Sequence, residues 1–397
     1  MISASAPPHA EGSLDIELAC RGAAVERVSI RSGRPLRASR ILENTTPDEA
    51  LARIPLVFSV CATAQCEAAL GACEQALGIT PAPEHRRARA MLVWMETARE
   101  HLLRILLDWS GFVGEEVPSM HLPQLIKLLP RLKGALYGEA TPFALHSRPT
   151  VDAAALEEAV AALSALNVLI LGSDGDSPLR TRADFDDWVA RGEVLPARLL
   201  RLVRERGWDR LGRGPCRWLP ELPKHALQQR MAADDDGSFI AAPTWQDGPC
   251  ETTALERQRE QPLIAELLAS EGNGLLTRLA ARLVELARIP QLLRQEGEAM
   301  AHAVPVSIGA ADPGMGLAQV EAARGRLAHY VEIAQGKVRR FRILAPTEWN
   351  FHPQGVAACG LMTLDGRDEE TVQRQGALWL NAIDPCVGFR LRRTAHA

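Results

Sequence analysis

The sequence lacks the features of several large protein classes. No short repeat runs through its 397 residues, and 47% of them are hydrophobic, which excludes collagen, a coiled coil and a disordered chain. No apolar run reaches the roughly 18 residues that cross a bilayer, because Ser164 and Asn167 interrupt the best one, 162–172. The formal net charge is only −4, so the charge gives no reason to expect nucleic acid or an anionic membrane as a partner.

Signals for export and for a disulfide scaffold are also missing. The first residues, MISASAPPHAEGSLDIE, contain no basic start and no apolar stretch, so we expect no secretory signal. Eight cysteines are too few to staple a chain of this length, which can bury a core without them. We therefore expect a cytoplasmic protein whose cysteines are free thiols.

Common catalytic motifs are absent as well. The sequence contains no GxGxxG, Walker A, HExxH or nucleophile-elbow motif, which leaves the common cofactor-binding and hydrolase classes without support. Cys61 and Cys66 are five residues apart, unlike the close pair of a zinc knuckle or a redox motif. A buried cysteine taken alone is a small hydrophobic residue. Composition and spacing by themselves therefore predict only a soluble, helix-rich domain.

What the sequence does contain is a mainly helical periodicity with two strand pairs. Apolar residues recur every three or four positions where we expect helices: from Thr46 as N-cap, then over 61–78, 91–109, 151–170, 262–294 with a break at 272–274, and 368–383 at the end of the chain. Alternation predicts a hairpin over 14–31 and two strands over 327–344 joined by a glycine-containing turn. The segment 173–252 is rich in Pro, Gly, Trp and charge and is expected to be irregular.

These patterns predict an α+β, predominantly helical fold, and no doubly wound sheet. We expect a flexible N-terminal tail over 1–13, followed by a single domain over 14–397. In that domain the hairpin and the first helices occupy 14–172, and the irregular, insert-rich middle occupies 173–252. The remaining helices, the second strand pair and the terminal motif occupy 253–397.

Four separated stretches resemble the large subunit of nickel–iron hydrogenases, and they occur in the same order. The stretch 381–389 resembles that family's terminal DPCxxCxxH motif, and 58–65 resembles its N-terminal CxxCxxxH motif. The stretch 321–325 resembles EAPRG, and 345–350 resembles PTTWNxxP. A weaker fifth match lies at 242–257. The ordered set covers nearly the whole chain and implies the large-subunit fold.

The departures from this family are as informative as the matches. In the hydrogenases two cysteines of each motif bind nickel, and two of the four also bridge to iron. Here Phe58 and Phe389 occupy two of the four positions. Only Cys61, at a bridging position, and Cys386, at a terminal nickel position, remain. Two thiolates cannot reproduce a four-thiolate site and phenylalanine offers no donor, so no nickel is expected.

The proton-exchanging groups of the hydrogenases are replaced too. Gln65 and Arg392 stand where the two motifs have histidine, and Arg40 stands where the family's RGxE segment has its proton-passing glutamate. Arginine does not exchange protons near neutral pH. The resemblance therefore implies a degenerate homologue that is not an enzyme and does not turn over hydrogen.

The iron side of the hydrogenase site is retained. Its iron carries two cyanides and one carbon monoxide, and the cyanide nitrogens accept charge-assisted hydrogen bonds from surrounding donors. Arg324 and Thr347 match the family residues around the cyanides, and the thiolates of Cys61 and Cys386 suit such an iron. This combination resembles the hydrogenase maturation proteins HupK and HoxV, regarded as scaffolds that carry the iron–cyanide–carbonyl fragment to the true large subunit.

The resemblance implies a transient iron cargo and two partners. These are the maturation complex that supplies the iron fragment and the hydrogenase large-subunit precursor, with no nucleic acid and no membrane insertion. One alternative is a metal-free pseudo-enzyme that protects or bridges other maturation factors. Another is a true hydrogenase or hydrogen sensor, against which Phe58 and Phe389 argue.

Each candidate residue also has a structural alternative. The two retained cysteines are otherwise packed thiols, and Cys66, which matches no family ligand position, is either a substitute ligand or a packing residue of its helix. Arg324 is otherwise a buried arginine paired with Glu321 or another carboxylate. Thr347 is otherwise a cap of the turn that follows proline.

Overall fold

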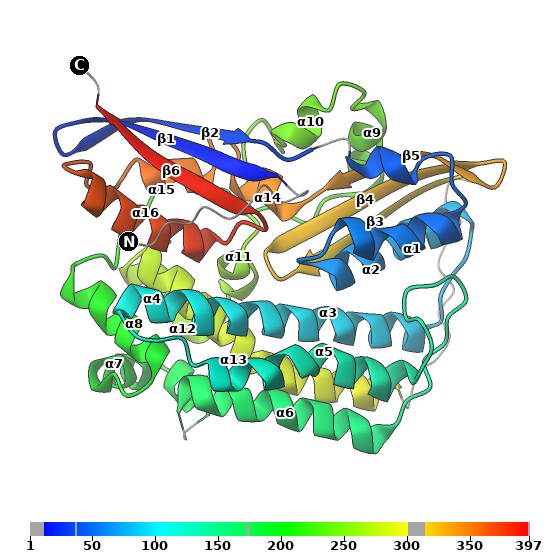
Figure 1. The fold of residues 1–397 in the computed structure, drawn as a ribbon, viewed down its shortest axis with the longest axis horizontal. Helices are drawn as coiled ribbons and strands as arrows, with labels where there is room; N and C mark the ends of the chain where they lie inside the picture. The colour runs from blue at the N-terminus through cyan, green and yellow to red at the C-terminus, as the bar shows by residue number, and fades with distance from the viewer. Residues whose placement is uncertain (1–11, 36–37, 173–174, 301–313, 396–397) are drawn as a thin grey trace. The chain divides into compact units, whose positions relative to one another are not determined.

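The computed structural model of the chain describes residues 12–35, 38–172, 175–300 and 314–395 (Figure 1). Of the tail predicted over 1–13, residues 1–11 lie outside these ranges, and Ser13 already begins the first strand.

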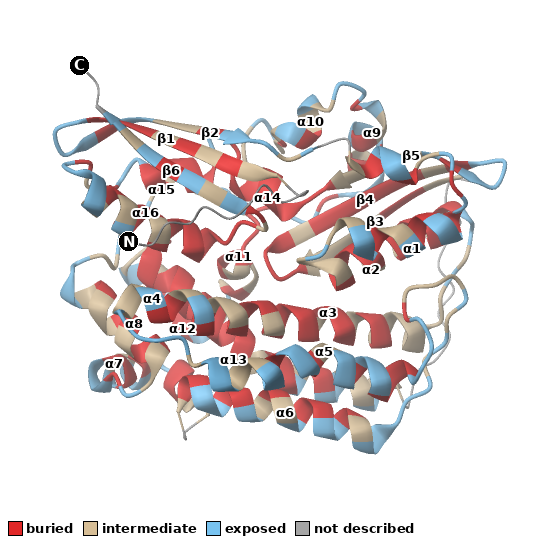
Figure 2. Ribbon diagram, in the orientation of Figure 1, coloured by how far each residue is buried: buried red, intermediate tan, exposed pale blue. Residues whose placement is uncertain are grey.

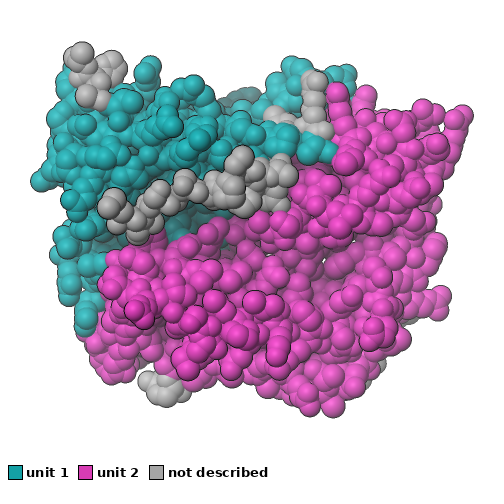
Figure 3. All heavy atoms as spheres, in the orientation of Figure 1, with its two compact units in different colours: residues 1–38, 200–282, 344–397 teal, residues 39–199, 283–343 magenta. Residues whose placement is uncertain are grey.

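The chain divides into two compact units, each assembled from segments far apart in the sequence (Figure 3). Unit 1 consists of 1–38, 200–282 and 344–397, and unit 2 consists of 39–199 and 283–343. The chain crosses between the units four times, and two of these crossings fall within the helices α8 (Leu195–Glu205) and α13 (Leu275–Met300). The single domain predicted over 14–397 stays a prediction.

A three-stranded sheet belongs to unit 1. Its order is β2 (Ala24–Ser32), β1 (Ser13–Arg21) and β6 (Gly388–Ala395). β1 and β2 form the predicted antiparallel hairpin. Leu14, Ile16 and Leu18 of β1 are buried and alternate with partly exposed Asp15 and Glu17, so one face of the sheet is apolar and the other charged.

Helices of unit 1 pack on the apolar face of this sheet. Leu14, Ile16 and Leu18 share a core cluster with Trp379 and Leu361, from α16 (Glu369–Ile383) and α15 (Val356–Leu361). The other helices of the unit are α9 (Lys224–Ala233), α10 (Ser238–Ala241), α11 (Ala254–Gln258), α12 (Pro262–Ser270) and α14 (Pro346–Asn350). The predicted break at 272–274 separates α12 from α13.

The prediction that a helix ends the chain is wrong in one respect. α16 is present and is capped by Asp368, but strand β6 follows it and pairs with β1 in parallel. In β6 the sequence Arg390-Leu391-Arg392-Arg393 buries only Leu391, so its alternation is weak. Its pairing partner also lies at the opposite end of the sequence, beyond the reach of a local pattern.

A second three-stranded sheet belongs to unit 2. Its order is β3 (Met315–Ala322), β4 (Gly325–Ala334) and β5 (Lys337–Leu344), and β4 is almost wholly buried (Figure 2). β4 and β5 are the predicted strand pair, joined at Gln335 and Gly336, which both have positive φ. β3 was not predicted. Helix α2 (Ala62–Ala76) packs on β3 and β4, after α1 (Pro47–Val57), which Thr46 caps as predicted.

Longer helices complete unit 2. α3 (Pro83–Leu103) continues into a π-helical turn (Arg104–Trp109). The two segments together include the helix that was predicted to end at Trp109. α5 (Leu122–Tyr137) packs on α3 and on α6 (Ala153–Leu171). Short helices occupy Ala38–Leu42, Ser110–Val113, Ser119–His121 and Ser177–Leu179.

The segment 173–252 is more helical than predicted. It contains α7 (Arg182–Arg191) and α8, followed by α9 and α10. In α8 the buried residues Leu199, Leu200 and Val203 lie on one face, although arginines interrupt them in the sequence. The stretches 206–223 and 242–252 between and after these helices are irregular, as predicted.

One helix among the described residues, α6, is long and apolar enough to span a membrane by length and composition. In the most apolar window of α6, 39% of the residues are buried inside the structure. The side-chain nitrogen of Asn167 donates to the carbonyl oxygen of Leu286 at 3.0 Å, which ties α6 to the part of α13 that belongs to unit 2.

Candidate functional site

Each compact unit carries one of the two retained cysteines. In unit 1, Cys386 follows α16 directly and is partly exposed. Asp384 ends that helix in the left-handed conformation, with φ of 66°. Arg282 donates to the carbonyl oxygen of Asn381 at 2.8 Å and lies 3.7 Å from the Asp384 carboxylate, so a buried guanidinium fixes the helix end that presents Cys386.

The Thr347 side chain lies within hydrogen-bonding distance of Cys386. Its hydroxyl oxygen lies 3.0 Å from the Cys386 sulfur and accepts the Cys386 backbone N–H at 3.4 Å. Toward a thiolate, which only accepts, the hydroxyl must be the donor. In this arrangement Thr347 holds the cysteine itself, and its predicted bond to a cyanide stays a prediction.

Local sequence explains why Thr347 lies there. Pro346 begins α14, and the Glu348 carboxylate accepts the N–H of Ala345 at 3.0 Å, which fixes the first turn around Thr347. Arg34 donates to Glu348 at 2.6 Å in a nearly buried ion pair. The turn that presents Thr347 is therefore held by both a helix cap and a salt bridge.

In unit 2, Cys61 occupies the N-cap position of α2 and is partly exposed. Gln65, one helical turn later, donates from Nε2 to the Cys61 sulfur at 3.6 Å. The Oε1 atom of Gln65 lies 2.7 Å from Nε2 of His329 on β4. The residue that replaces the motif histidine thus contacts the cysteine sulfur and is itself bonded to a histidine from the sheet.

A buried glutamate fixes the first turn of α2. The two carboxylate oxygens of Glu96 on α3 accept the N–H groups of Thr63 and Ala64 at 2.8 and 3.0 Å. These N–H groups have no partner inside the helix, and a carboxylate satisfies them with the favourable sign of the helix dipole. Burial raises the pKa of Glu96, although both N–H bonds lower it. α3 thereby sets the position of the backbone next to Cys61.

Arg324 lies in the turn between β3 and β4, where Ala322 pairs with Gly325. It is buried, and its Nη2 atom lies 3.1 Å from the Glu100 carboxylate on α3. Glu321, the partner considered from the sequence, pairs with Arg326 at 2.5 Å. Arg324 is therefore a buried arginine paired with a carboxylate, Glu100 of α3, which agrees with the structural alternative considered from the sequence. Its bond to a cyanide stays a prediction.

Cys66 has the surroundings of a packing residue. It is 6% exposed and belongs to a core cluster with Ile54, Leu70 and Cys73. Burial and the nearby Glu96 carboxylate raise the pKa of its thiol to about 12, which disfavours the thiolate that binds metals. These surroundings favour the packing alternative over a substitute ligand.

The two phenylalanines at the lost ligand positions are partly buried and contribute to packing. Phe58 contacts the core cluster of unit 2 that contains Cys66, and Phe389 contacts the core cluster below the sheet of unit 1. Within the described residues, no three His, Cys, Asp or Glu side chains converge as a metal site.

A hydrogen-bonded cluster around Cys216 in unit 1 was not predicted. The Cys216 thiol donates to the Glu251 carboxylate at 2.8 Å, and Arg278 donates to the same carboxylate at 2.5 and 2.9 Å. Burial, together with the Glu251 charge, raises the pKa of the Cys216 thiol and keeps it protonated. The sequence signal was the weak match at 242–257, which includes Glu251 but neither partner.

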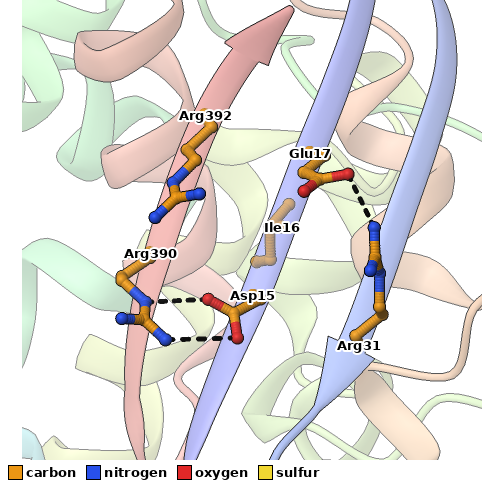
Figure 4. A pocket seen from close by; sticks show the side chains of 6 residues that line it. All are labelled: Asp15, Ile16, Glu17, Arg31, Arg390 and Arg392. Atoms are coloured by element: carbon orange, nitrogen blue, oxygen red, sulfur yellow. Dashed lines mark hydrogen bonds and ion pairs between the residues drawn. The ribbon is translucent and has the colours of Figure 1, made fainter.

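A surface pocket of about 250 Å³ lies on the charged face of the sheet in unit 1 (Figure 4). Arg390 pairs with Asp15 and Arg31 with Glu17, both at 2.8 Å, and Arg392 lies beside them. Arg392 replaces the histidine of the terminal motif and is exposed on this face, and none of the five candidate site residues lines the pocket.

Comparisons with known proteins agree on the fold and the family. The nickel-dependent hydrogenase family matches residues 220–359. Solved [NiFeSe] hydrogenases are similar in fold: one from Desulfovibrio vulgaris Hildenborough has a TM-score of 0.62 at 15% identity, covering 92% of this chain and 94% of that one. One from Desulfomicrobium baculatum has a TM-score of 0.62 at 15% identity, covering 93% and 95%. The α+β, mainly helical large-subunit fold expected from the motifs is confirmed.

Curated relatives match along nearly the entire chain. The hydrogenase expression/formation protein HupK of Azotobacter vinelandii is 31% identical, covering 96% of this chain and 98% of that protein. HupV of Azotobacter chroococcum is 30% identical with the same coverage, and HoxV of Cupriavidus necator is 31% identical, covering 91% of each. The chain belongs to the HupK, HupV and HoxV family of hydrogenase expression/formation proteins, which shares its fold with the hydrogenase large subunit.

Proposed function

We propose that this protein is a non-catalytic factor in the maturation of a nickel–iron hydrogenase. In this proposal it carries an iron bearing two cyanides and one carbon monoxide, which it receives from a maturation complex and passes to the large-subunit precursor. The iron is cargo rather than a resident cofactor. The relatives' names, expression/formation proteins, support the maturation role.

The observation that carries the proposal is the state of the two retained cysteines. One cysteine of each hydrogenase motif remains, and each sulfur has a hydrogen-bonding side chain beside it, Thr347 at Cys386 and Gln65 at Cys61. Unlike the Cys216 thiol, which donates to a carboxylate, these two sulfurs lie beside groups that can donate to a thiolate. We infer that both sulfurs act as ligands, with Arg324 as a donor to the cyanides.

The donor chemistry suits an iron that brings its own ligands. Two thiolates are a poor site for a bare metal ion, since transition metals in proteins are held by several side chains. An iron that already has three diatomic ligands needs only a few ligands from the protein, and soft thiolates are appropriate ligands for it. Fewer protein ligands also mean weaker retention, which favours transfer to the large subunit.

The same residues argue against hydrogen turnover. Phe58 and Phe389 pack against core clusters at two nickel-ligand positions, and Arg40 is exposed where the proton-passing glutamate would be. Without four thiolates there is no nickel site, and without nickel the family's reaction cannot proceed. We therefore propose a scaffold that is not an enzyme.

The experiment is complementation of a host whose copy of this gene is deleted. Cys61→Ala and Cys386→Ala are each expected to abolish active hydrogenase, because either change removes an iron ligand. Cys359→Ala is the matched control. Cys359 also belongs to unit 1 and is partly exposed, and the partner of its sulfur among the described residues is a backbone oxygen, that of Gln354. Full hydrogenase activity with both ligand cysteines replaced would favour the metal-free pseudo-enzyme instead.

A further inference from the structure

We propose that Gln65 and His329 are positioning residues that hold the Cys61 sulfur as a hydrogen-bond acceptor. In this arrangement a neutral His329 donates to the Gln65 side-chain oxygen, and the Gln65 side-chain nitrogen donates to the sulfur. The role of this chain of bonds in binding rests on the proposed function of Cys61 as an iron ligand.

The direction of the chain follows from the chemistry of an amide. Gln65 directs Nε2 to the Cys61 sulfur at 3.6 Å and Oε1 to Nε2 of His329 at 2.7 Å. An amide oxygen can only accept, so the imidazole must carry its proton on Nε2. If the Gln65 amide were turned the other way, its oxygen would face the Cys61 sulfur. A thiolate has no proton to donate to that oxygen.

The environment of His329 favours the same tautomer. The ring is fully buried, and burial lowers its pKa to about 3, so it is neutral and carries one proton. Among the described residues, Nδ1 has no hydrogen-bond partner. A buried N–H without an acceptor is rarer in proteins than an unsatisfied acceptor. The proton therefore belongs on Nε2, where Gln65 accepts it.

The side chains that form this row of hydrogen bonds are held rigidly. Gln65 is 1% exposed and lies one turn from Cys61, bonded through its backbone N–H to the Cys61 carbonyl oxygen at 3.0 Å. The ring of Phe341 on β5 meets the His329 ring edge-on, with centroids 5.4 Å apart and planes at 82°. A side chain in which both ends of the amide are engaged cannot rotate without breaking both bonds.

The expected consequence is on the electronic character of the ligand. A thiolate that accepts an N–H bond gives less electron density to its metal, and second-shell bonds of this kind also orient the ligand. Loss of the donor should make the sulfur a stronger electron donor to iron. More electron density on iron weakens the C–O bond of a bound carbon monoxide through back-donation. The infrared band of that bond then moves to lower wavenumber.

The first measurement needs no iron. In protein with ¹⁵N-labelled histidine, the ring signals of His329, assigned by their loss in His329→Gln, report which nitrogen carries the proton. We expect the proton on Nε2, with a signal that shifts in Gln65→Leu. Gln75→Leu is the control, because Gln75 lies on the same helix but bonds the N–H of Leu317 instead. A proton on Nδ1 in the wild type would overturn the proposal.

The second measurement uses protein purified with its cargo. The carbon monoxide band should move to lower wavenumber in Gln65→Leu and in His329→Leu, and should stay in place in Gln75→Leu. His329→Gln restores a donor at the position of Nε2 and should restore the wild-type band. An unchanged band in Gln65→Leu would overturn the proposal. If no preparation shows cyanide or carbonyl bands, the proposed function fails, and the histidine signals still decide whether the chain of bonds exists.

Discussion

The Glu67 carboxyl group on α2 is predicted to make the stability of this protein depend on pH. Burial raises its pKa to about 8 from an ordinary value of 4.5, although Arg89 lowers it. The folded chain therefore binds a proton that the unfolded chain has released. Stability should fall as pH rises from about 4.5 to about 8, by up to about 1.4 kcal/mol per pH unit.

The substitution Glu67→Gln imitates the protonated acid, so it should remove this part of the pH dependence. The free energy of unfolding in urea, measured across the same range, should then be higher in the variant near the upper end and similar near the lower end. Equal slopes for the variant and the wild type would show that Glu67 is ionised in the folded protein.

Glu251 is predicted to stabilise unit 1 through Arg278. Both side chains are 1% exposed, and burial alone would raise the Glu251 pKa, but Arg278 and the other donors hold that pKa below its ordinary value. Glu251→Ala leaves a buried guanidinium uncompensated and should cost about 3–5 kcal/mol of unfolding free energy. The exposed pair of Glu157 and Arg294 is the control, and Glu157→Ala should cost less than about 1 kcal/mol. Similar losses in both variants would contradict this reading.

Among single residues, motifs named Cys61, Cys386, Arg324 and Thr347 as candidates, and their role in a common site stays a prediction. The contacts of these residues could not be predicted. The sequence did not predict that Glu100 accompanies Arg324, because the two residues are 224 positions apart. The bond between Gln65 and His329 spans 264 positions. Such pairs depend on how helices and sheets pack, and no local pattern contains that information.

Among helices and strands, the close contact between α2 and β3 gives a direct test. A Cβ added at Gly316 on β3 would overlap the backbone oxygen of Ala72 on α2, so the two elements approach closely only because this residue is glycine. Gly316→Ala should cost about 1–3 kcal/mol of unfolding free energy through overpacking.

The control for this prediction is Gly134→Ala. Gly134 is exposed within α5, and a Cβ there would meet nothing within 4 Å. Since alanine is a better helix former than glycine, that variant should gain about 0.5–1 kcal/mol. Chemical denaturation of both variants measures the difference. A neutral Gly316→Ala would mean that α2 and β3 do not pack as described.

Strong local signals predicted the elements that contain them. The β1–β2 hairpin, the Thr46 cap, the break at 272–274 and the β4–β5 turn all have local sequence causes and are confirmed. β3, β6 and the helices of 173–252 were missed. β6 needs a partner from the other end of the chain, and α8 hides a buried apolar stripe among arginines.

For the chain as a whole, a few motifs predicted the fold better than composition did. Sequence identity to the solved hydrogenases is only 15–16%, yet the alignment covers 92–93% of this chain. Residues outside the motifs need only keep the apolar pattern that packs each element, and many sequences satisfy that requirement. The motifs remain recognisable where the rest has diverged, even though Phe58, Phe389, Gln65 and Arg392 replace family residues within them.

The infrared spectrum of the protein, purified from a host that makes the iron fragment and analysed for iron, tests the iron-carrying role most directly. We predict cyanide and carbonyl stretching bands in the wild type and in Cys359→Ala, and their loss in Cys61→Ala and in Cys386→Ala. Iron-rich protein without these bands, or the same bands in a variant that lacks both Cys61 and Cys386, would contradict that role.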